Sequence, residues 1–424
     1  MAPFRPLVAL VTAMSAALAA AQCESLTPVS QPVLATGYQA KLILNGLSDP
    51  RSLQFDTLGN LLIAQQGGTG IQYVKLTDNG GLNVCVESQK QLVPNAQLNH
   101  GIALSADGKT LYASTATAVL AYPYDAEAGT VGEARVIINI PQQSGHSTRT
   151  LLIPKSSPNT ILVSVGSGPN LDLPTAEQSS GRSMVRAFDL TTLTGSAVAY
   201  NSGELLGWGL RNSVGLAENV DGGIWTVENS LDNMARDGVD VHNDNPGEEL
   251  NYHGIINSTS NELKGANYGY PHCFAVWDNS TIPNFNVGSQ VIQGSASGEI
   301  TDEYCQTTPV PPRLTFQAHL APLDIKFAPD GGAAYISFHG SWNRQPPDGY
   351  RLSRVEFGAD GQPTAPSTSR DAAVNIMWNG NASACPGSCF RPVGLAWGTN
   401  GRLFLVSDST NELFVLTTPA TTYE

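Results

Sequence analysis

Arginine and histidine residues recur at one position in this sequence, beside the ends of six similar segments. Together with one asparagine they are Arg51, His146, Arg149, Arg211, Asn212, His339, Arg344 and Arg391. A guanidinium group binds carboxylates through paired hydrogen bonds, and an imidazole suits a general base near neutral pH. Like charges that gather in one place repel unless an anion binds among them. The pattern therefore predicts a site for a ligand with several carboxylates or phosphates.

A second group of polar residues follows the fourth of these segments. Residues 236–251 are rich in Asp, Asn and Glu, and Pro246 and Gly247 bend the chain and expose carbonyl groups. Oxygen ligands at this density suit Ca²⁺. The segment lacks the spacing and the turn glycine of an EF-hand, and a polar loop without an ion explains these residues equally well.

The elements that position these residues come from an internal repeat. Six segments share an apolar alternating run, a turn rich in Asp, Asn, Gly or Pro, and a second apolar run: residues 51–66, 100–115, 149–166, 214–229, 323–340 and 393–409. Alternation with a period of two on both sides of a tight turn predicts a β-hairpin. Because a hairpin begins and ends at the same edge of its sheet, six equivalent hairpins place the Arg and His residues around one mouth.

The repeat predicts an all-β fold, a six-bladed β-propeller. The segments are far enough apart for a four-stranded sheet each, with an insertion between the fourth and fifth, and no long amphipathic helix interrupts them. Residues 38–44 are expected to complete the last blade and close the ring. A pair of β-sandwiches is the alternative, and the regular repetition disfavours it. No linker divides residues 22–424, which predicts a single domain.

Composition and the N-terminus indicate a secreted protein. Residues 1–21 have one positive charge, an apolar stretch and small residues before Gln22, which is the layout of a cleaved signal peptide. A formal net charge of −14 disfavours nucleic acid and anionic membranes as partners. Three sequons, at Asn257, Asn279 and Asn381, are expected to carry glycans.

The six cysteines agree with an oxidising compartment. Their spacing favours the pairs Cys385–Cys389 and Cys273–Cys305, which leaves Cys23 for Cys85. None of them has the spacing of a zinc site.

Several motifs resemble one enzyme family. They are GLRNSVGL (209–216), GEELN (247–251), GANYGYPHCF (265–274), HGSWNRQPPDGYRL (339–352) and FRPVGLAWGTNGRLFLVSD (390–408). In this order they resemble the soluble quinoprotein glucose and sorbosone dehydrogenases, and most of all the fungal secreted pyranose dehydrogenases. The resemblance extends over nearly all of residues 22–424.

The resemblance implies a propeller that holds pyrroloquinoline quinone (PQQ) and Ca²⁺ over its channel mouth. His146 matches the family's general base, which takes a proton while the sugar's C1 passes hydride to the quinone. Arg211 is expected close to the reactive quinone carbonyl, followed by Asn212. The remaining expected contacts of the cofactor are Arg51, Arg149, His339, Arg344 and Arg391.

The resemblance places the Ca²⁺ ligands less firmly, because the acidic loop is longer here than in the commoner pattern. Alignment on GEELN puts the metal-binding carbonyls at Asn243 and Asp244. The side chain of Asp240 is an alternative ligand.

The resemblance implies a pyranose, or an aldehyde hydrate, as substrate. Fungal relatives can carry a haem domain and a carbohydrate-binding module, and neither follows the last hairpin here. The expected electron acceptor is therefore a separate haem protein, a copper polysaccharide monooxygenase or a small quinone, and the expected state is a monomer. Two other classes remain open: a Ca²⁺-dependent propeller lactonase or other hydrolase, and a non-catalytic glycan-binding propeller.

Overall fold

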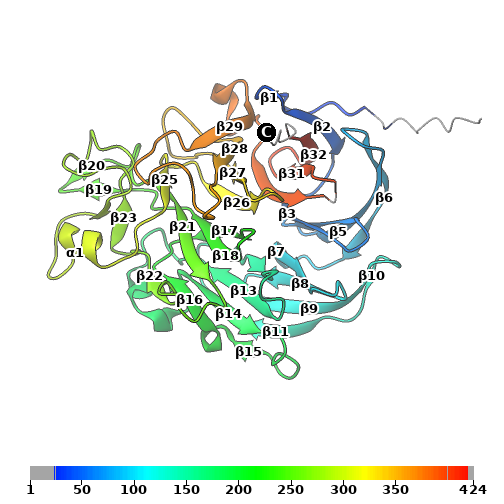
Figure 1. Cartoon of the computed structure of the whole chain (residues 1–424), viewed down its shortest axis with the longest axis horizontal. Coiled ribbons are helices and arrows are strands. Elements are labelled where there is room, and N and C mark those ends of the chain that lie inside the picture. The colour runs from blue at the N-terminus through cyan, green and yellow to red at the C-terminus, as the bar shows by residue number, and fades with distance from the viewer. Residues whose placement is uncertain (1–22, 24, 399, 419–424) are drawn as a thin grey trace, which may run out of the picture.

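The molecule consists mainly of β-sheets arranged around a common centre, as the computed structural model in Figure 1 shows. The structure describes residues 23, 25–398 and 400–418, so the signal peptide expected at 1–21 lies outside the described residues. The one α-helix among the described residues is α1 (Asp302–Thr307), and none of them forms a helix long and apolar enough to cross a membrane. The short 3₁₀ helices are Leu173–Ala176, Gln178–Ser180, Tyr200–Ser202 and Ala382–Ala384.

Six sheets are the blades of a β-propeller, numbered by the chain order of their innermost strands. Blade 1 contains β3 (Pro50–Phe55), β4 (Leu61–Gln65), β5 (Gly70–Asp78) and β6 (Val84–Val93). Blade 2 contains β7 (Leu98–Leu104), β8 (Thr110–Thr115), β9 (Ala118–Asp125), β10 (Thr130–Val131), β11 (Arg135–Asn139) and β15 (Val198–Ala199). Blade 3 contains β12 (Leu151–Leu152), β13 (Thr160–Val165), β14 (Met184–Asp189), β16 (Glu204–Trp208) and β22 (Ala266–Asn267).

The other three blades complete the ring. Blade 4 contains β17 (Ser213–Glu218), β18 (Gly223–Glu228), β21 (Glu248–Ile255) and β25 (Leu314–Phe316). Blade 5 contains β26 (Pro322–Phe327), β27 (Ala333–Phe338), β28 (Arg351–Glu356), β29 (Ala373–Asn379) and β1 (Pro32–Leu34). Blade 6 contains β30 (Pro392–Trp397), β31 (Leu403–Ser407), β32 (Glu412–Thr417) and β2 (Gln39–Leu44).

The six predicted hairpins are the two inner strands of the six blades, which confirms the predicted architecture. Each inner strand pairs antiparallel with the next strand in the chain. The predicted closure is also confirmed, since β2 pairs with β32 and thereby joins the N-terminal segment to the last blade. The inner strands contact one another in the order β3, β7, β12, β17, β26, β30 and back to β3.

The core lies between blades, because each sheet buries both faces against its neighbours. Six apolar clusters fill the six interfaces, one for each pair of adjacent blades. Two inner strands carry a glycine where neighbouring blades approach closely. A Cβ atom at Gly101 would lie 2.1 Å from the carbonyl oxygen of Arg149. A Cβ atom at Gly394 would lie 2.6 Å from the carbonyl oxygen of Arg51. The inner strands therefore approach closely near the axis.

Hydroxyl groups fix the blades to one another near the axis. Ser164 Oγ on β13 donates to the carbonyl of Ser213 on blade 4, at 2.8 Å. Ser337 Oγ on β27 donates to the carbonyl of Val393 on blade 6, at 2.6 Å. Both serines are buried, so each bond satisfies a buried hydroxyl and a buried backbone carbonyl of a neighbouring inner strand.

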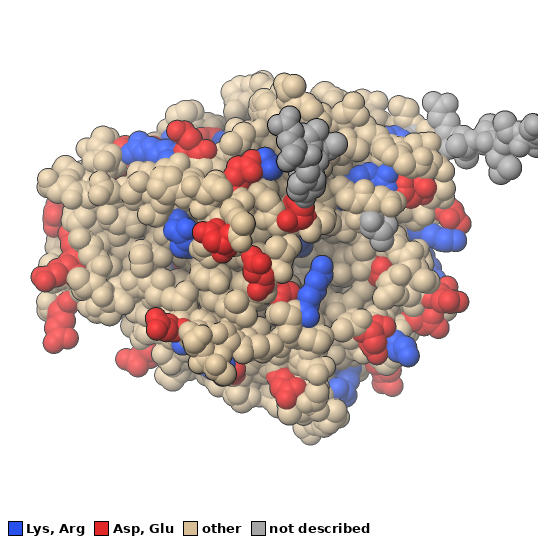
Figure 2. Space-filling model, in the orientation of Figure 1, with Lys and Arg blue, Asp and Glu red and all other residues tan. Residues whose placement is uncertain are grey.

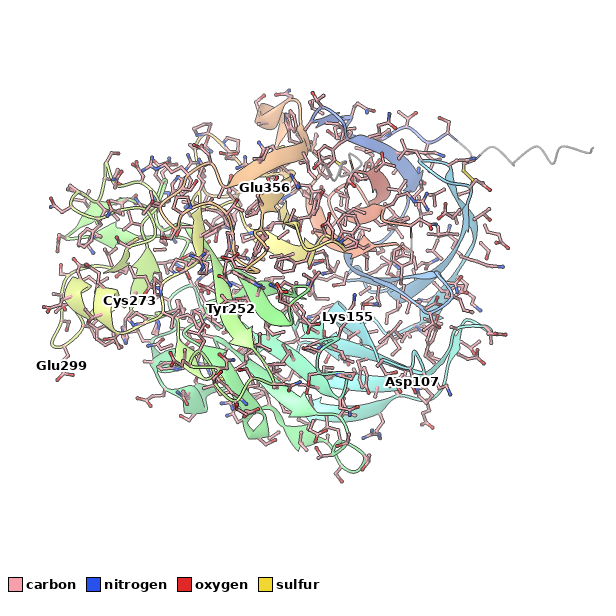
Figure 3. The ribbon with its side chains drawn as sticks, viewed as in Figure 1. Asp107, Lys155, Tyr252, Cys273, Glu299 and Glu356 are labelled. Carbon is pink, nitrogen blue, oxygen red and sulfur yellow. A yellow bond between two sulfur atoms is a disulfide. The ribbon has the colours of Figure 1, made fainter. Side chains whose placement is uncertain are left out.

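The expected insertion between the fourth and fifth hairpins forms a separate element at one side of the ring. It contains the small sheets β19 (Ala235–Arg236) with β20 (Val239–Asp240) and β23 (Cys273–Ala275) with β24 (Gln290–Ile292), and α1 (Figure 1). Cys273, labelled in Figure 3, forms a disulfide with Cys305 of α1. The structure also contains the disulfides Cys23–Cys85 and Cys385–Cys389, so all three favoured pairs are confirmed.

Candidate active site

The expected site residues lie next to the ends of the inner hairpins, as the repeat requires. Those at or just before the inner strands are Arg51, His146, Arg149, Arg211, Asn212 and Arg391, and those after the second strand of blade 5 are His339 and Arg344. We call this end of the inner hairpins the mouth. On the face drawn in Figure 2, acidic and basic side chains are interspersed and form no broad basic patch.

His146 is held through one ring nitrogen, which leaves the other free. Its Nδ1 lies 3.0 Å from the carbonyl oxygen of Ser167 and 3.0 Å from its Oγ. Because a carbonyl oxygen only accepts, Nδ1 carries the proton and Nε2 keeps its lone pair. Burial, together with the charge of Arg211, lowers the pKa of His146 to about 4. At neutral pH this half-buried imidazole is therefore an uncharged base.

Arg211 is surrounded by acceptors on two blades. Its Nε donates to the carbonyl of Asn170 and its Nη1 to that of Asn229, at 2.9 and 3.0 Å. Its Nη2 donates to Asn170 Oδ1 at 2.8 Å and to the Asp232 carboxylate at 2.9 Å. The backbone carbonyl of Arg211 accepts from the amide of Ser167, at 2.7 Å. Ser167 therefore contacts both Arg211 and His146 and fixes their relative position.

Asn212 and His146 approach each other across Gly166. A Cβ at Gly166 would lie 2.3 Å from Oδ1 of Asn212 and 3.1 Å from Cβ of His146. A residue with a side chain would push these two groups apart. The structure therefore brings together three of the expected residues, His146, Arg211 and Asn212.

Arg149 lies underneath this group. Its side chain donates to the carbonyls of Ala116, His146 and Thr148, at 3.1, 2.9 and 2.8 Å. Burial lowers its pKa to about 10, so it stays charged at neutral pH. Arg149 is 1% exposed, and its bonds to backbone carbonyls brace the His146 loop. Its expected contact with a cofactor stays a prediction.

On the opposite side of the mouth, Arg51 and His339 share the carboxylate of Asp408. Arg51 Nη1 lies 2.7 Å from Oδ2, and His339 Nε2 lies 2.8 Å from Oδ1. Burial raises the pKa of Asp408, but His339 and Arg51 lower it more, to about 2. Burial lowers the pKa of His339 although Asp408 opposes this. Asp408 is therefore the ionised partner, and a neutral His339 donates to it.

Arg391 connects this group to the neighbouring blade. Its Nε donates to the carbonyl of His339 and its Nη2 to that of Gly340, both at 3.0 Å. The same loop of blade 5 continues to Asn343, whose Nδ2 donates to the carbonyl of Asp232 at 2.8 Å. The two sides of the mouth are thus joined through the loop after β27.

The three expected metal ligands are divided between two environments. Asn243 and Asp244 lie together, because the Nη1 of Arg344 donates to the Asn243 carbonyl and to the Asp244 carboxylate. Asp240 lies on β20, with its side chain 69% exposed and bonded to His242 Nδ1 at 2.6 Å. No group of three or more His, Cys, Asp or Glu in the described part of the chain could hold a metal ion. The carbonyl and carboxylate oxygens of Asn243 and Asp244 have the hard-donor chemistry that Ca²⁺ requires, and the ion would need further oxygens from a ligand.

The mouth also contains buried polar atoms without hydrogen-bond partners. They include Nε of Arg51, Nε of Arg344, Oδ1 of Asn343 and Nδ1 of His100. Leaving buried polar groups unpaired costs free energy, and the two arginine Nε atoms among them are donors. A ligand with several carboxylates supplies the missing acceptors, so these residues fit the polyanion that the sequence predicts.

Sequence reasoning missed Asp408, although the repeat contains a signal for it. Asp408 follows the second strand of blade 6 directly, as His339 follows that of blade 5. The equivalent residues in blades 3 and 4 also contribute: Gly166 allows the close approach described above, and the carbonyl of Asn229 binds Arg211. Asp232 and Asn170, which lie in loops without a repeated position, gave no comparable signal.

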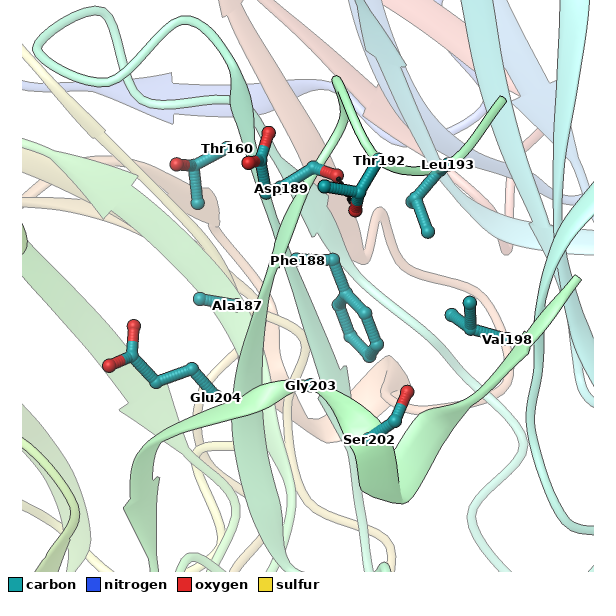
Figure 4. Close-up of a pocket in the computed structure, with 10 residues that line it drawn as sticks. All are labelled: Thr160, Ala187, Phe188, Asp189, Thr192, Leu193, Val198, Ser202, Gly203 and Glu204. Carbon is teal, nitrogen blue, oxygen red and sulfur yellow. Dashed lines mark hydrogen bonds between the residues drawn. The ribbon is translucent and has the colours of Figure 1, made fainter. Parts of the chain in front are cut away.

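A cavity of about 310 Å³ lies on blade 3, away from the mouth (Figure 4). The ring of Phe188 lies beside Val198 and Ser202, and a Cβ at Gly203 would come within 2.5 Å of that ring. Asp189 and Glu204 supply the charged groups, and none of the lining residues belongs to the mouth. The cavity has neither the base nor the cationic groups of the mouth.

Comparison with known proteins agrees with this geometry. A family model described as TrAA12-like matches residues 32–419. The chain belongs to this family. A pyrroloquinoline quinone-dependent sugar dehydrogenase of Hypocrea jecorina (strain QM6a) is 47% identical over 393 residues, which are 91% of this chain and 89% of that protein.

Two further relatives show how much of each chain the similarity covers. A pyrroloquinoline quinone-dependent pyranose dehydrogenase of Coprinopsis cinerea is 37% identical over 408 residues; the match covers 92% of this chain but 55% of that protein. A calcium structure of Carbohydrate-Active Enzymes family AA12 from Trichoderma reesei has a TM-score of 0.90 and 47% identity, and covers 94% of this chain and 99% of that chain. This TrAA12-like chain therefore shares its whole propeller with its relatives.

Proposed function

We propose that this chain is a PQQ-dependent sugar dehydrogenase that oxidises C1 of a pyranose, or an aldehyde hydrate. The observation that carries the proposal is the free Nε2 of His146, held next to the guanidinium of Arg211 by Ser167. The names of the two curated relatives support the same activity. When bound, PQQ supplies the two-electron oxidant that the amino acids lack.

His146 acts as the general base. Its unprotonated Nε2 takes the proton of the hydroxyl at the carbon being oxidised, while the bond from Nδ1 to Ser167 keeps the ring in this tautomer. The cation of Arg211 stabilises negative charge that develops next to it. Because Arg211 is fixed by four hydrogen bonds, it needs no rearrangement to do so.

The other cations of the mouth hold the cofactor. Carboxylates would satisfy the unpaired Nε donors of Arg51 and Arg344. His339, whose Nε2 is bonded to Asp408, completes the contacts together with Asn212 and Arg391. Asn243 and Asp244 would hold Ca²⁺, whose charge favours electron acceptance by a quinone bound beside it. The calcium structure of the Trichoderma reesei relative supports the choice of ion.

We further propose that the protein is secreted and glycosylated and that it works as a monomer. The signal-like residues 1–21 and the three disulfides support an oxidising compartment. Asn257, Asn279 and Asn381 are all exposed, as glycan acceptors have to be. The electrons leave to a separate acceptor, namely a haem protein, a copper polysaccharide monooxygenase or a quinone.

The experiment that tests this function is a titration of metal-free apoprotein with PQQ, with and without Ca²⁺, followed by dye reduction with a panel of pyranoses. Calcium-dependent binding and sugar-dependent bleaching of the dye are expected. Failure to bind PQQ in either condition would overturn the proposal, and lactonase and glycan-binding assays would then follow. Replacing PQQ by the same concentration of citrate controls for binding of any polycarboxylate.

A further inference from the structure

A row of four polar residues crosses blade 4 from its innermost to its outermost strand. Strand pairing places Ser213 on β17 opposite Glu228 on β18, Glu228 opposite Glu249 on β21, and Glu249 opposite Thr315 on β25. Directly opposite residues of antiparallel strands point to the same face of a sheet. The four side chains therefore form one line, and each is at most 4% exposed.

The two carboxyl groups of this row have no cationic partner of their own. Glu228 Oε1 accepts from the backbone amide of Arg211 at 2.5 Å, but the guanidinium of Arg211 pairs with Asp232. One Asn251 Nδ2 donates to Oε2 of Glu228 at 3.3 Å and to Oε2 of Glu249 at 3.0 Å. Two carboxylates buried this close together cannot both be ionised without a counter-ion, so the pair needs a proton.

Hydrogen-bond acceptors surround the proposed position of this proton. Asn251 Oδ1, Ser213 Oγ and Thr315 Oγ1 are buried without partners. The amide oxygen can accept a hydrogen bond, and the two hydroxyl groups can both accept and donate one. Burial raises the pKa of Glu249 to about 7, and burial together with Glu249 raises that of Glu228 well above its usual range.

The charged and titratable groups near the pair come from the start of β17 and from β21. Arg211, at the start of β17, opposes the rise in the Glu228 pKa, whereas Glu248 on β21 adds to it. Glu248 itself has its pKa raised to about 7 by burial. His253 on β21 packs at a tilt against Tyr268 of the neighbouring blade and is neutral, because burial lowers its pKa to about 3.

The row begins directly behind the mouth, since Ser213 follows Arg211 and Asn212 in the chain. We propose that Glu228 and Glu249 share one proton, which the pair exchanges with solvent. The pair takes up this proton when a multiply anionic ligand binds at the mouth beside Arg211. Each negative charge placed above the pair makes ionisation of a second carboxyl less favourable. The identity of that ligand as PQQ rests on the proposed function, whereas the shared proton does not.

The first test needs no ligand. A group whose pKa rises from 4.5 in the unfolded chain to about 7 in the folded protein contributes stability at low pH that is lost between those values. We therefore compare urea unfolding of the wild-type apoprotein and Glu249→Gln from pH 5 to 8. The wild type is expected to lose up to about tenfold in its folding equilibrium constant per pH unit relative to the variant.

Two further variants make this test specific. Glu218→Gln is the matched control: Glu218 lies on β17 of the same blade and also accepts from backbone amides, those of Lys155 and Ser156, but it is partly exposed. Its pH dependence should equal that of the wild type. If Glu249→Gln does not fold, Glu228→Gln replaces it. Parallel curves for the wild type and the folded glutamine variant would overturn the shared proton.

The second test measures the coupling. Calorimetric titration of Ca²⁺-loaded apoprotein with PQQ, slightly above neutral pH, is repeated in HEPES and in Tris, whose enthalpies of ionisation differ. The wild type is expected to take up a fraction of a proton, seen as a difference in binding enthalpy between the buffers, and Glu249→Gln to take up less. PQQ binding with the same enthalpy in both buffers would overturn the coupling. If PQQ does not bind, the proposed function and the coupling fall together, and the unfolding curves still decide the shared proton.

Discussion

Two histidines lie at the mouth on different blades, and they are held through opposite ring nitrogens. His146 of blade 3 bonds through Nδ1 to Ser167, which leaves Nε2 free. His339 of blade 5 bonds through Nε2 to the carboxylate of Asp408. Burial lowers the pKa of both rings, but the charged neighbour differs: Arg211 lowers the pKa of His146 further, whereas Asp408 opposes the lowering for His339.

The comparison shows that the hydrogen-bond partner, and not the residue type, decides what a histidine can do. A carbonyl partner fixes the tautomer of His146 and adds no negative charge, so the ring is available to accept a proton. A carboxylate partner fixes His339 as a donor and links it to Arg51. We therefore expect the His146 side of the mouth to carry the chemistry and the Asp408 side to carry the binding of the cofactor.

Replacing His146 with alanine should have the largest effect. Loss of the general base is expected to lower turnover by about 10²- to 10⁴-fold. Affinity for PQQ should change by only a few-fold, because the Arg51 side remains intact. Steady-state kinetics and PQQ titration measure the two quantities separately. If loss of cofactor accounts for the whole defect, His146 is not the base.

Replacing Asp408 with asparagine should destabilise the apoprotein by about 3 kcal/mol, because it leaves the buried Arg51 without a counter-ion. Asp408 has its pKa lowered to about 2, so its contribution is present above the pKa of the unfolded carboxyl and is lost as the pH falls towards 2. Urea unfolding at neutral pH measures the difference. Asp107→Asn, in an exposed turn of blade 2, is the control and should change stability little.

Replacing His339 with alanine should weaken PQQ binding by up to about tenfold, because Asp408 loses one of the two donors that hold it and the Arg51 side chain in place. Turnover of the fully loaded variant should fall much less than in His146→Ala. Titration with PQQ and kinetics at saturating PQQ test both statements. A fall in turnover as large as that of His146→Ala, with unchanged affinity, would reverse the roles assigned to the two sides.

The smallest effect is expected in the pH profile. Because His146 has its pKa lowered to about 4, kcat/KM should stay level down to that pH and then fall about tenfold per pH unit as Nε2 becomes protonated. His339→Ala should keep this acidic limb. A limb near the ordinary histidine pKa in the wild type would show that His146 is not held neutral as the structure indicates.

Much of the fold could be predicted because its signals are local. Alternation and turn residues identify each hairpin within a short segment, and the six inner hairpins occupy the predicted places. The repeat also predicted which residues surround the mouth. It did not predict their bonding partners: Arg149 binds three backbone carbonyls, and Arg51 shares the carboxylate of Asp408 with His339.

By itself, the sequence determined the hairpin repeat, the disulfide pairs and the kinds of side chain gathered at the mouth, since each is written in neighbouring residues or in their spacing. Only the tertiary structure decided the free nitrogen of His146, the carboxylate shared by Arg51 and His339, and the proton needed by Glu228 and Glu249. Asp408 is 357 positions from Arg51. The role of a buried polar group depends on the partners and the burial that the closed ring supplies, and these partners are not adjacent in the chain.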